Sequence, residues 1–244
     1  MKIVTSAFLL AISLLVIGQQ ASDEEQVRQV IAYTQAYRKH LPSLECDETM
    51  ISQRVRDGKV KRAVTIKATL RELRDENEPG GFRDDYTYKS VDGKRAKANL
   101  KAPYLVYNVF ANSLGIGESP RPACFIYRFA TLDDGRTLQF NIDSRPGVPD
   151  PSCKKIPDDY HKTMLIDTAS GAIRRVERRI SQQFADDNLE IPFVTIDYAP
   201  QKLGDETFWL PTRFEANDPH LQGRMIATYS NCHRYTVAHK IVMP

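Results

Sequence analysis

The sequence predicts a mainly β, α+β fold, in which a curled antiparallel sheet forms an open half-barrel with an N-terminal helix packed on it. Three observations lead to this prediction. Segments of alternating apolar and polar residues recur along most of the chain, which is typical of strands with one buried face. Pairs such as Asp-Gly and Ser-Gly stand between these segments and favour tight turns. One stretch near the N-terminus instead has apolar residues at helical spacing.

The segment 191–215 shows the hairpin pattern most clearly. It holds two apolar series, Val194, Ile196 and Tyr198 before the turn and Phe208, Leu210 and Phe214 after it. Gly204 and Asp205 lie between the two series and mark the turn. The alternation predicts an antiparallel hairpin with one apolar face.

The first 21 residues have the pattern of a secretory signal peptide. Lys2 precedes an apolar run at 7–17, which at about 11 residues is shorter than the ~20 that a membrane span needs. Small residues at Gly18 and Ala21 leave two positions open for cleavage. We therefore expect residues 22–244 to form a single domain that is periplasmic or secreted, with no membrane span after cleavage.

An amphipathic helix is predicted directly after this segment. Ser22 and Glu25 form a capping-box pattern, and Pro42 ends the helix. Its apolar stripe consists of Val27, Val30, Ile31, Thr34, Tyr37 and Leu41. A stripe of this kind must be buried against another element, and the sheet is the element available.

The remaining segments predict about ten strands, with turns at Asp57-Gly58, Asp92-Gly93, Asp134-Gly135 and Ser170-Gly171. Two segments are ambiguous. Pro103 is suited to open a short helix that ends near Gly115, although a strand fits this segment nearly as well. The segment 173–184 has helical spacing of its apolar residues, yet its neighbours favour a strand.

Four widely spaced cysteines predict two disulfides in an exported chain. Three pairings are possible. The hairpin at 124–145 brings Cys124 near Cys153, which leaves Cys46 to pair with Cys232. A zinc site at Cys232, His233 and His239 is the alternative, although the spacing differs from that of structural zinc sites.

The sequence contains no recognisable catalytic or cofactor-binding motif. A formal net charge of +3 is small and dispersed, so nucleic acid is not expected as a partner. The five histidines, His40, His161, His220, His233 and His239, are scattered along the chain. His233 and His239 have no carboxylate nearby in sequence that would orient them. We therefore expect a protein that is not an enzyme and that uses no cofactor and no metal.

The order of these elements resembles the LolA-like lipoprotein-carrier superfamily, which includes uncharacterised exported bacterial half-barrel proteins. Ile166-Asp167 with Gly171, and the stretch from Asp197-Tyr198 to Pro211, carry the resemblance. It implies a concave apolar face that holds an acyl chain or another hydrophobic small molecule. The residues expected to bind this ligand are Val194, Ile196, Tyr198, Phe208, Leu210, Phe214, Phe140 and Met164.

Two other interpretations stay open at this point. Each of these eight residues also suits an ordinary hydrophobic core, without any ligand. The half-barrel would also serve as an envelope sensor or interaction domain that docks another envelope protein and transports no ligand.

Overall fold

A computed structural model of the 244-residue chain shows the fold. It describes residues 25–30, 32–33, 35–37, 39–77, 81–97, 100–106, 110, 122–132, 135–151, 153–156, 158–179 and 193–236. The expected signal peptide at 1–21 lies outside these residues. In the described part, no helix has both the length and the apolar character that crossing a membrane requires.

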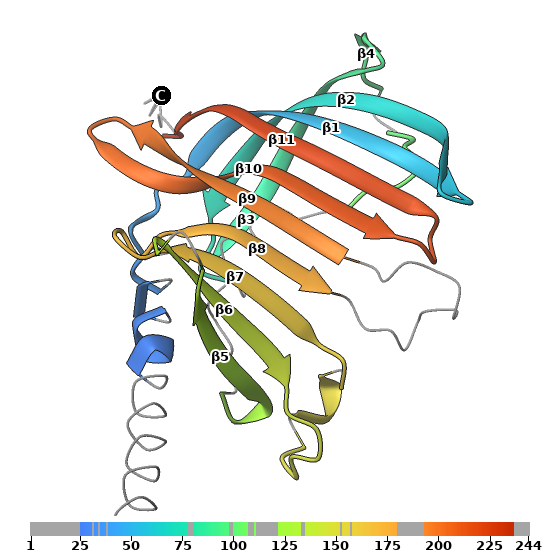
Figure 1. Cartoon of the computed structure of the whole chain (residues 1–244). Coiled ribbons are helices and arrows are strands. Elements are labelled where there is room, and N and C mark those ends of the chain that lie inside the picture. The colour runs from blue at the N-terminus through green and yellow to red at the C-terminus, as the bar shows by residue number, and fades with distance from the viewer. Residues whose placement is uncertain are drawn as a thin grey trace, which may run out of the picture.

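The chain forms one antiparallel sheet of eleven strands that curls without closing (Figure 1). The strands are β1 (Leu44–Arg56), β2 (Lys59–Arg74), β3 (Phe82–Val91), β4 (Lys94–Arg95), β5 (Phe125–Thr131), β6 (Thr137–Ser144), β7 (His161–Asp167), β8 (Ile173–Arg179), β9 (Phe193–Leu203), β10 (Glu206–Asp218) and β11 (Gly223–Arg234). Their order across the sheet is β4-β3-β2-β1-β11-β10-β9-β8-β7-β6-β5. The predicted curled antiparallel sheet is therefore confirmed.

The hairpin turns largely follow the glycine pairs of the sequence. Asp57 and Gly58 connect β1 to β2 with positive φ angles of 53° and 66°, as a two-residue turn that matches the strand twist requires. Asp92-Gly93 and Gly204-Asp205 also lie in turns, as predicted. The segment 173–179 is strand β8, which settles the ambiguity for these residues in favour of the strand.

One row of apolar side chains crosses nine of the strands. Residues that lie directly opposite each other in an antiparallel pair project from the same face of the sheet. The pairing register links Ile66, Met50, Ala227, Phe214, Ile196, Val176, Met164, Phe140 and Phe129 in this way, from β2 to β5. We call the face that carries this apolar row the inner face.

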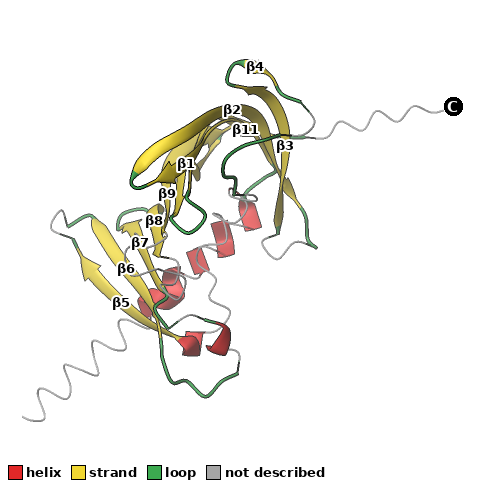
Figure 2. Ribbon diagram, turned by 90° about the vertical axis from the view of Figure 1, so that its right-hand side faces the viewer, coloured by secondary structure: helices red, strands yellow, loops and turns green. Residues whose placement is uncertain are grey.

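The N-terminal helix packs against the core of the sheet, and Figure 2 shows it running diagonally across the concave side. Val30 and Leu41 are buried in the core, while Val27 and Tyr37 pack against it. The Tyr37 hydroxyl donates a hydrogen bond of 2.6 Å to the Trp209 carbonyl on β10. Four residues of the predicted stripe thus have the expected role, whereas positions 31 and 34 lie outside the described residues.

The end of the helix is fixed by an arginine from the sheet. The last carbonyl groups of a helix lack partners within the helix and attract cations. The guanidinium group of Arg74 on β2 donates to the carbonyls of Lys39 and Leu41, at 2.5 and 2.8 Å. This contact ties the helix to the β2 end of the inner face.

A second element, which we call the covering segment (residues 100–106), packs on the inner face near β1 and β11. The Tyr104 amide donates to the Ser52 hydroxyl at 2.9 Å, and this hydroxyl donates in turn to the Tyr104 carbonyl at 2.5 Å. Residues 103–106 have no helical structure, whereas Phe110 is helical, so the predicted helix does not begin at Pro103. Ser52 satisfies the backbone groups of Tyr104 that a helix would have used.

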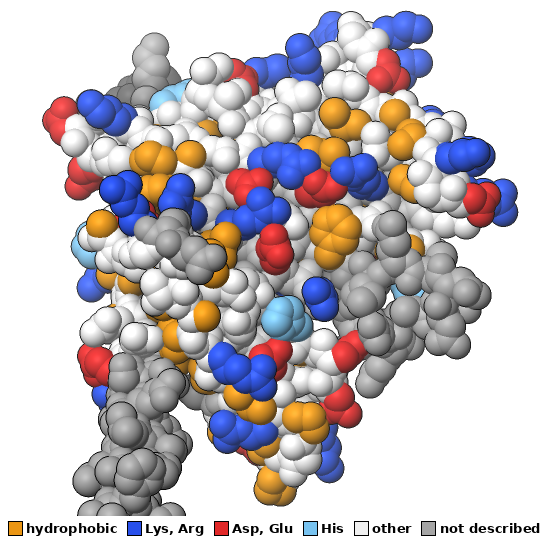
Figure 3. Space-filling model, in the orientation of Figure 1, with side chains coloured by type: hydrophobic (Ala, Val, Ile, Leu, Met, Phe, Trp, Pro, Cys, Tyr) orange, Lys and Arg blue, Asp and Glu red, His pale blue; other side chains and the backbone are white. Residues whose placement is uncertain are grey.

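The outer face is polar and carries an ion-pair network. Figure 3 shows basic and acidic side chains interspersed across the middle of the sheet. Arg175 on β8 contacts Asp197 on β9 at 3.2 Å, and Arg213 on β10 lies 3.9 Å from the same carboxylate. Arg224 on β11 then pairs with Glu215 at 2.8 Å. Charges on one face and apolar residues on the other fix the register, because a shift by one residue would exchange the faces.

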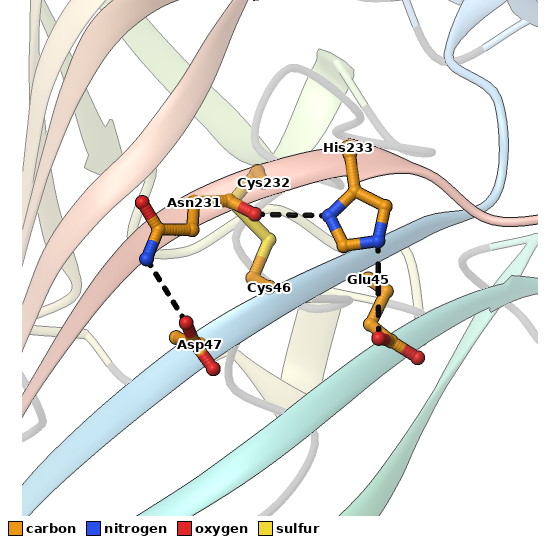
Figure 4. Close-up of a disulfide and its surroundings, with 6 residues drawn as sticks. All are labelled: Glu45, Cys46, Asp47, Asn231, Cys232 and His233. Atoms are coloured by element: carbon orange, nitrogen blue, oxygen red, sulfur yellow. Dashed lines mark hydrogen bonds and ion pairs between the residues drawn. A yellow bond between two sulfur atoms is a disulfide. The ribbon is translucent and has the colours of Figure 1, made fainter.

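Two disulfides connect the cysteines in the expected pairing. Cys124 is bonded to Cys153, and Cys46 on β1 is bonded to Cys232 on β11 (Figure 4). Cys46 lies at a register shift between β1 and β11, which is the geometry of a β-bulge. Because Cys232 takes part in this bond, the zinc alternative at Cys232 and His233 is wrong.

We predict that Gly223→Ala destabilises the protein through the covering segment. A Cβ atom at Gly223 would lie only 2.3 Å from the Tyr104 ring. Overpacking of this kind costs about 1–3 kcal/mol of unfolding free energy. Chemical denaturation of Gly223→Ala, of Tyr104→Ala and of the double variant measures this. In the Tyr104→Ala background the glycine substitution should cost much less, and an equal cost in both backgrounds would contradict the contact.

We also predict that the two disulfides contribute unequally. The Cys46–Cys232 bond spans 186 residues and the Cys124–Cys153 bond spans 29. Loop-closure entropy then gives about 5 kcal/mol for the first and about 3.5 kcal/mol for the second. Denaturation of the Cys46→Ala/Cys232→Ala and Cys124→Ala/Cys153→Ala variants compares them. A larger loss from the second pair would reverse the expected order.

Candidate functional site

The structure brings the eight expected ligand-binding residues into one apolar core. Four of them, Phe140, Met164, Ile196 and Phe214, lie in the apolar row and are buried. Tyr198 and Leu210 are buried in the same core, and Val194 and Phe208 are half-buried against it. The inner face therefore unites residues from strands β6, β7, β9 and β10.

Aromatic rings are stacked at the β5 end of this row. The ring of Phe140 lies between those of Phe129 and Tyr127, with centroid distances of 4.4 and 5.6 Å. Phe140 is buried, whereas Phe129 and Tyr127 stay half-buried. This end of the inner face thus presents aromatic surface that its neighbours do not fully enclose.

The inner face also carries a half-buried basic group. Lys162 pairs with Ile142 and Arg178 in the sheet register, two residues along β7 from Met164. Burial lowers the pKa of the Lys162 amine to about 7, and the nearby Arg178 cation adds to this fall. This basic group lies in the β6–β8 part of the inner face.

Three buried acids lie in the opposite part of the inner face, between β1 and β3. We call Glu48, Glu72 and Asp84 the carboxyl cluster. Their exposed fractions are 2%, 1% and 8%. Glu48 lies on β1 opposite Tyr229 of β11, and Glu72 on β2 lies opposite Asp84 of β3. The even-numbered alternation of β1 and β2 places these glutamates on the same side as Met50 and Ile66.

Among the described residues, Asp84 is the member of the carboxyl cluster whose hydrogen bonds have ordinary geometry. Asp84 accepts from the Tyr86 hydroxyl at 2.7 Å and from the Phe110 amide at 3.3 Å. Both side-chain oxygens of Glu48 and of Glu72 are enclosed and lack a hydrogen-bond partner among the described residues. The Tyr229 hydroxyl faces Glu48 but is also without a partner within normal hydrogen-bond geometry.

Burial keeps Glu48 and Glu72 uncharged at neutral pH. It raises the pKa of the Glu48 carboxyl to about 8, and the Asp84 carboxylate adds to this rise, while the Tyr229 hydroxyl opposes it. Burial also raises the pKa of Glu72 far above its usual range, again with a contribution from Asp84. Loss of water around a carboxylate disfavours its charged form, which explains both directions.

Sequence reasoning missed the carboxyl cluster, although one signal for it was present. In β1 and β2 the glutamates occupy positions that the apolar alternation assigns to the buried face. Acidic residues are almost never fully buried without a partner. A glutamate at such a position therefore indicates a functional or structural role for its carboxyl group.

A separate polar group lies on the outer face. It borders a cavity of about 840 Å³ that is lined by Leu132, Gln139, His161, Thr163, Leu165, Glu177, Arg178, Arg179, Phe193 and Thr195. The His161 Nδ1 atom lies 2.6 Å from an Asp143 oxygen, and its Nε2 atom lies 3.0 Å from the Thr163 hydroxyl. Cross-strand pairing in the β6–β7 hairpin brings this carboxylate to His161.

The contacts from Asp143 to His161 to Thr163 follow the acid, histidine and hydroxyl order of a catalytic triad, but their hydrogen-bond directions differ from those of a triad. The Thr163 hydroxyl donates its single proton to the Asn141 side-chain oxygen at 2.9 Å, because that oxygen can only accept. Thr163 therefore accepts from His161 instead of giving it a proton, as a nucleophile would. The arrangement is a hydrogen-bonded ladder on a sheet surface. Within the described ranges, no group of three or more His, Cys, Asp or Glu side chains is arranged to hold a metal ion.

Comparison with known proteins gives matches among solved structures only. No protein-family model matches the chain, and no curated protein matches it. A proposed outer membrane lipoprotein-sorting protein domain from Vibrio parahaemolyticus has a TM-score of 0.46 at 9% identity, over 86% of this chain and 93% of that one. A DUF1329 family protein from Desulfovibrio piger has a TM-score of 0.43 at 11% identity, over 88% and 94%.

A LolA superfamily protein from Nitrosomonas europaea is also similar, with a TM-score of 0.38 at 9% identity over 89% of this chain and 97% of that one. Because all three TM-scores are below 0.5, none of these structures bears on what this chain binds.

We predict that the carboxyl cluster makes stability fall as the pH rises. Between pH 5 and pH 8 an unfolded glutamate has lost its proton, whereas the folded Glu48 keeps it up to a pKa of about 8. The folded state thus binds more protons, and the unfolding free energy declines through this window. Glu48→Gln removes this decline, so its gain in stability over the wild type should be at least about 2 kcal/mol larger at pH 8 than at pH 5.

Denaturation at the two pH values measures this difference. Glu177→Gln is the matched control, because Glu177 lies on the outer face with its side chain 53% exposed and paired to Arg175. Its effect on stability should stay the same at both pH values. A Glu48→Gln variant with the same pH slope as the wild type would show that Glu48 is solvated.

Proposed function

We propose that this protein is an exported binding protein that takes a hydrophobic ligand on the inner face of its open sheet. The observation that carries this proposal is the apolar row, which crosses nine strands and ends at half-buried aromatic rings on β5. A ligand pocket is typically concave and lined mostly by apolar and aromatic side chains with a few polar groups. The inner face has this composition.

Two features support export as the setting of this function. Both disulfides join cysteines that lie far apart in the sequence, and disulfides of this kind persist in oxidising compartments. The first 21 residues also have the pattern of a signal peptide. We therefore place the protein in the periplasm or outside the cell.

Two neighbouring residues on β7 allow a matched test of the inner face. Met164 lies in the apolar row and is fully buried, whereas Leu165 projects from the outer face and is half-buried. The wild type should bind a neutral lipophilic dye saturably, as measured by its fluorescence. Met164→Trp should weaken this binding tenfold or more by filling the inner face, and Leu165→Trp should leave it nearly unchanged.

Thermal denaturation of both variants must show that they remain folded under the assay conditions. Dye binding by the wild type that does not saturate, or equal loss from both substitutions, would contradict a ligand site on the inner face. The eight expected ligand-binding residues would then form an ordinary core.

A further inference from the structure

We infer that the ligand of the inner face carries a protonated primary amine, and that this ammonium group binds at Glu48, Glu72 and Asp84. The inference names the chemical class of the ligand and rests on the proposed function. It starts from the four carboxyl oxygens of Glu48 and Glu72, which are enclosed and lack a hydrogen-bond partner in the described part of the chain.

Enclosed oxygens of this kind indicate that a hydrogen-bond donor is missing. In folded proteins the large majority of buried polar side-chain atoms are hydrogen-bonded, because leaving one unpaired costs desolvation free energy. Glu48 exposes 2% of its surface and Glu72 exposes 1%, so bulk water does not supply the donors. In this proposal, a ligand bound on the inner face supplies them.

Tyr229 is a second and independent pointer to this site. It is 5% exposed, and its hydroxyl also lacks a hydrogen-bond partner among the residues described. Glu48 lies directly opposite Tyr229 in the pairing of β1 with β11. Burial raises the pKa of the Tyr229 hydroxyl, and the nearby Glu48, Asp84 and Glu72 raise it further. The Tyr229 hydroxyl thus lies close to the carboxyl cluster, and it adds unused hydrogen-bonding capacity to that of Glu48 and Glu72.

The chemistry of these atoms selects a primary ammonium group. Ionised carboxylates only accept hydrogen bonds, and a primary ammonium group has three donors and a positive charge. A quaternary ammonium group has the same charge but no N–H donor. A metal ion is not indicated, because the described acids are not arranged as a metal site.

The position of the cluster shows where the rest of the ligand would lie. The Glu48–Tyr229 pair is the next inner-face pair along β1 and β11 from Met50–Ala227, which belongs to the apolar row. From there the row continues through Phe214 to Ile196 on β9, three strands and about 14 Å from β1. An alkyl chain attached to the ammonium group would therefore lie on apolar side chains.

The charge of the ligand head group decides whether it binds at the carboxyl cluster or at Lys162, at the other end of the inner face. Lys162 on β7 lies five strands from β1, which is about 24 Å. An anionic head group would be repelled by ionised Glu48 and would favour Lys162 instead. A comparison of cationic, neutral and anionic ligands of one chain length therefore tests the assignment.

Binding of an ammonium group also requires a proton to leave. The titratable groups that act electrostatically on one another here are Glu48 on β1, Glu72 on β2, Asp84 and Tyr86 on β3, Tyr229 on β11 and Tyr37 on the helix. Glu48 is uncharged at neutral pH in the free protein and must ionise to pair with the cation. One proton is then released, so affinity should rise about tenfold from pH 6 to pH 7.

The test uses isothermal titration calorimetry of the purified mature protein with four ligands that share a twelve-carbon chain. These are dodecylammonium, dodecyltrimethylammonium, dodecanol and dodecanoate, each kept below the concentration at which it forms micelles. We expect dodecylammonium to bind at least tenfold more tightly than the other three at pH 7. The double variant Glu48→Gln/Glu72→Gln should reduce this preference below threefold and keep its affinity for dodecanol.

Each alternative outcome has a distinct meaning. Equal binding of all four ligands would leave the proposed function standing and would overturn the ammonium assignment. Tightest binding of dodecanoate would overturn it in favour of the Lys162 end. Equal loss of dodecylammonium and dodecanol in the double variant would show that the cluster only supports the fold. Absence of binding by every ligand would contradict the proposed function itself.

Discussion

Keeping one face of an unclosed eleven-stranded sheet out of water is the constraint on which the rest of this structure depends. A closed barrel hides its interior by its own curvature, whereas an open sheet needs other elements to cover it. The helix covers part of the inner face through Val30 and Leu41, and the covering segment packs near β1 and β11. The contacts of Arg74 and Ser52 hold these two elements in place.

The same constraint makes the carboxyl cluster informative. An acid placed on a covered apolar face loses its hydrating water, and this desolvation lowers the unfolding free energy of the protein. The protein could have avoided this cost with leucine or valine at both glutamate positions of β1 and β2. Instead, Glu48 and Glu72 remain enclosed next to the apolar row. Binding of a hydrogen-bond donor would account for both their placement and their unused oxygens.

The sequence was sufficient for the local structure, because alternation and turn residues act within one hairpin. The alternation of Val194 and Ile196 and the turn at Gly204 predicted β9 and β10 correctly. The pairing of β1 with β11 joins residues nearly 190 positions apart, and no local pattern encodes it. The error in the predicted helix start at Pro103 has the same origin, because Ser52 is distant in sequence and supplies the hydrogen bonds that hold Tyr104.

The candidate site was only partly predictable for the same reason. Apolar residues that alternate in strands were expected to share a concave face, and the apolar row unites four of them. The carboxyl cluster depends on three strands, β1, β2 and β3, that meet only in the folded sheet. Asp143 likewise reaches His161 through cross-strand pairing, so this histidine has a carboxylate partner 18 residues away in the sequence.

The central claim is that the inner face encloses carboxyl groups that stay protonated at neutral pH until a ligand binds. Titration of 13C-labelled glutamate carboxyl groups by NMR tests this claim most directly. We predict two glutamate signals that titrate far above the rest, one of them with a pKa of about 8 that is absent from Glu48→Gln. If every glutamate titrated near its ordinary value of about 4.3, the inner face would be solvated and the account would be contradicted.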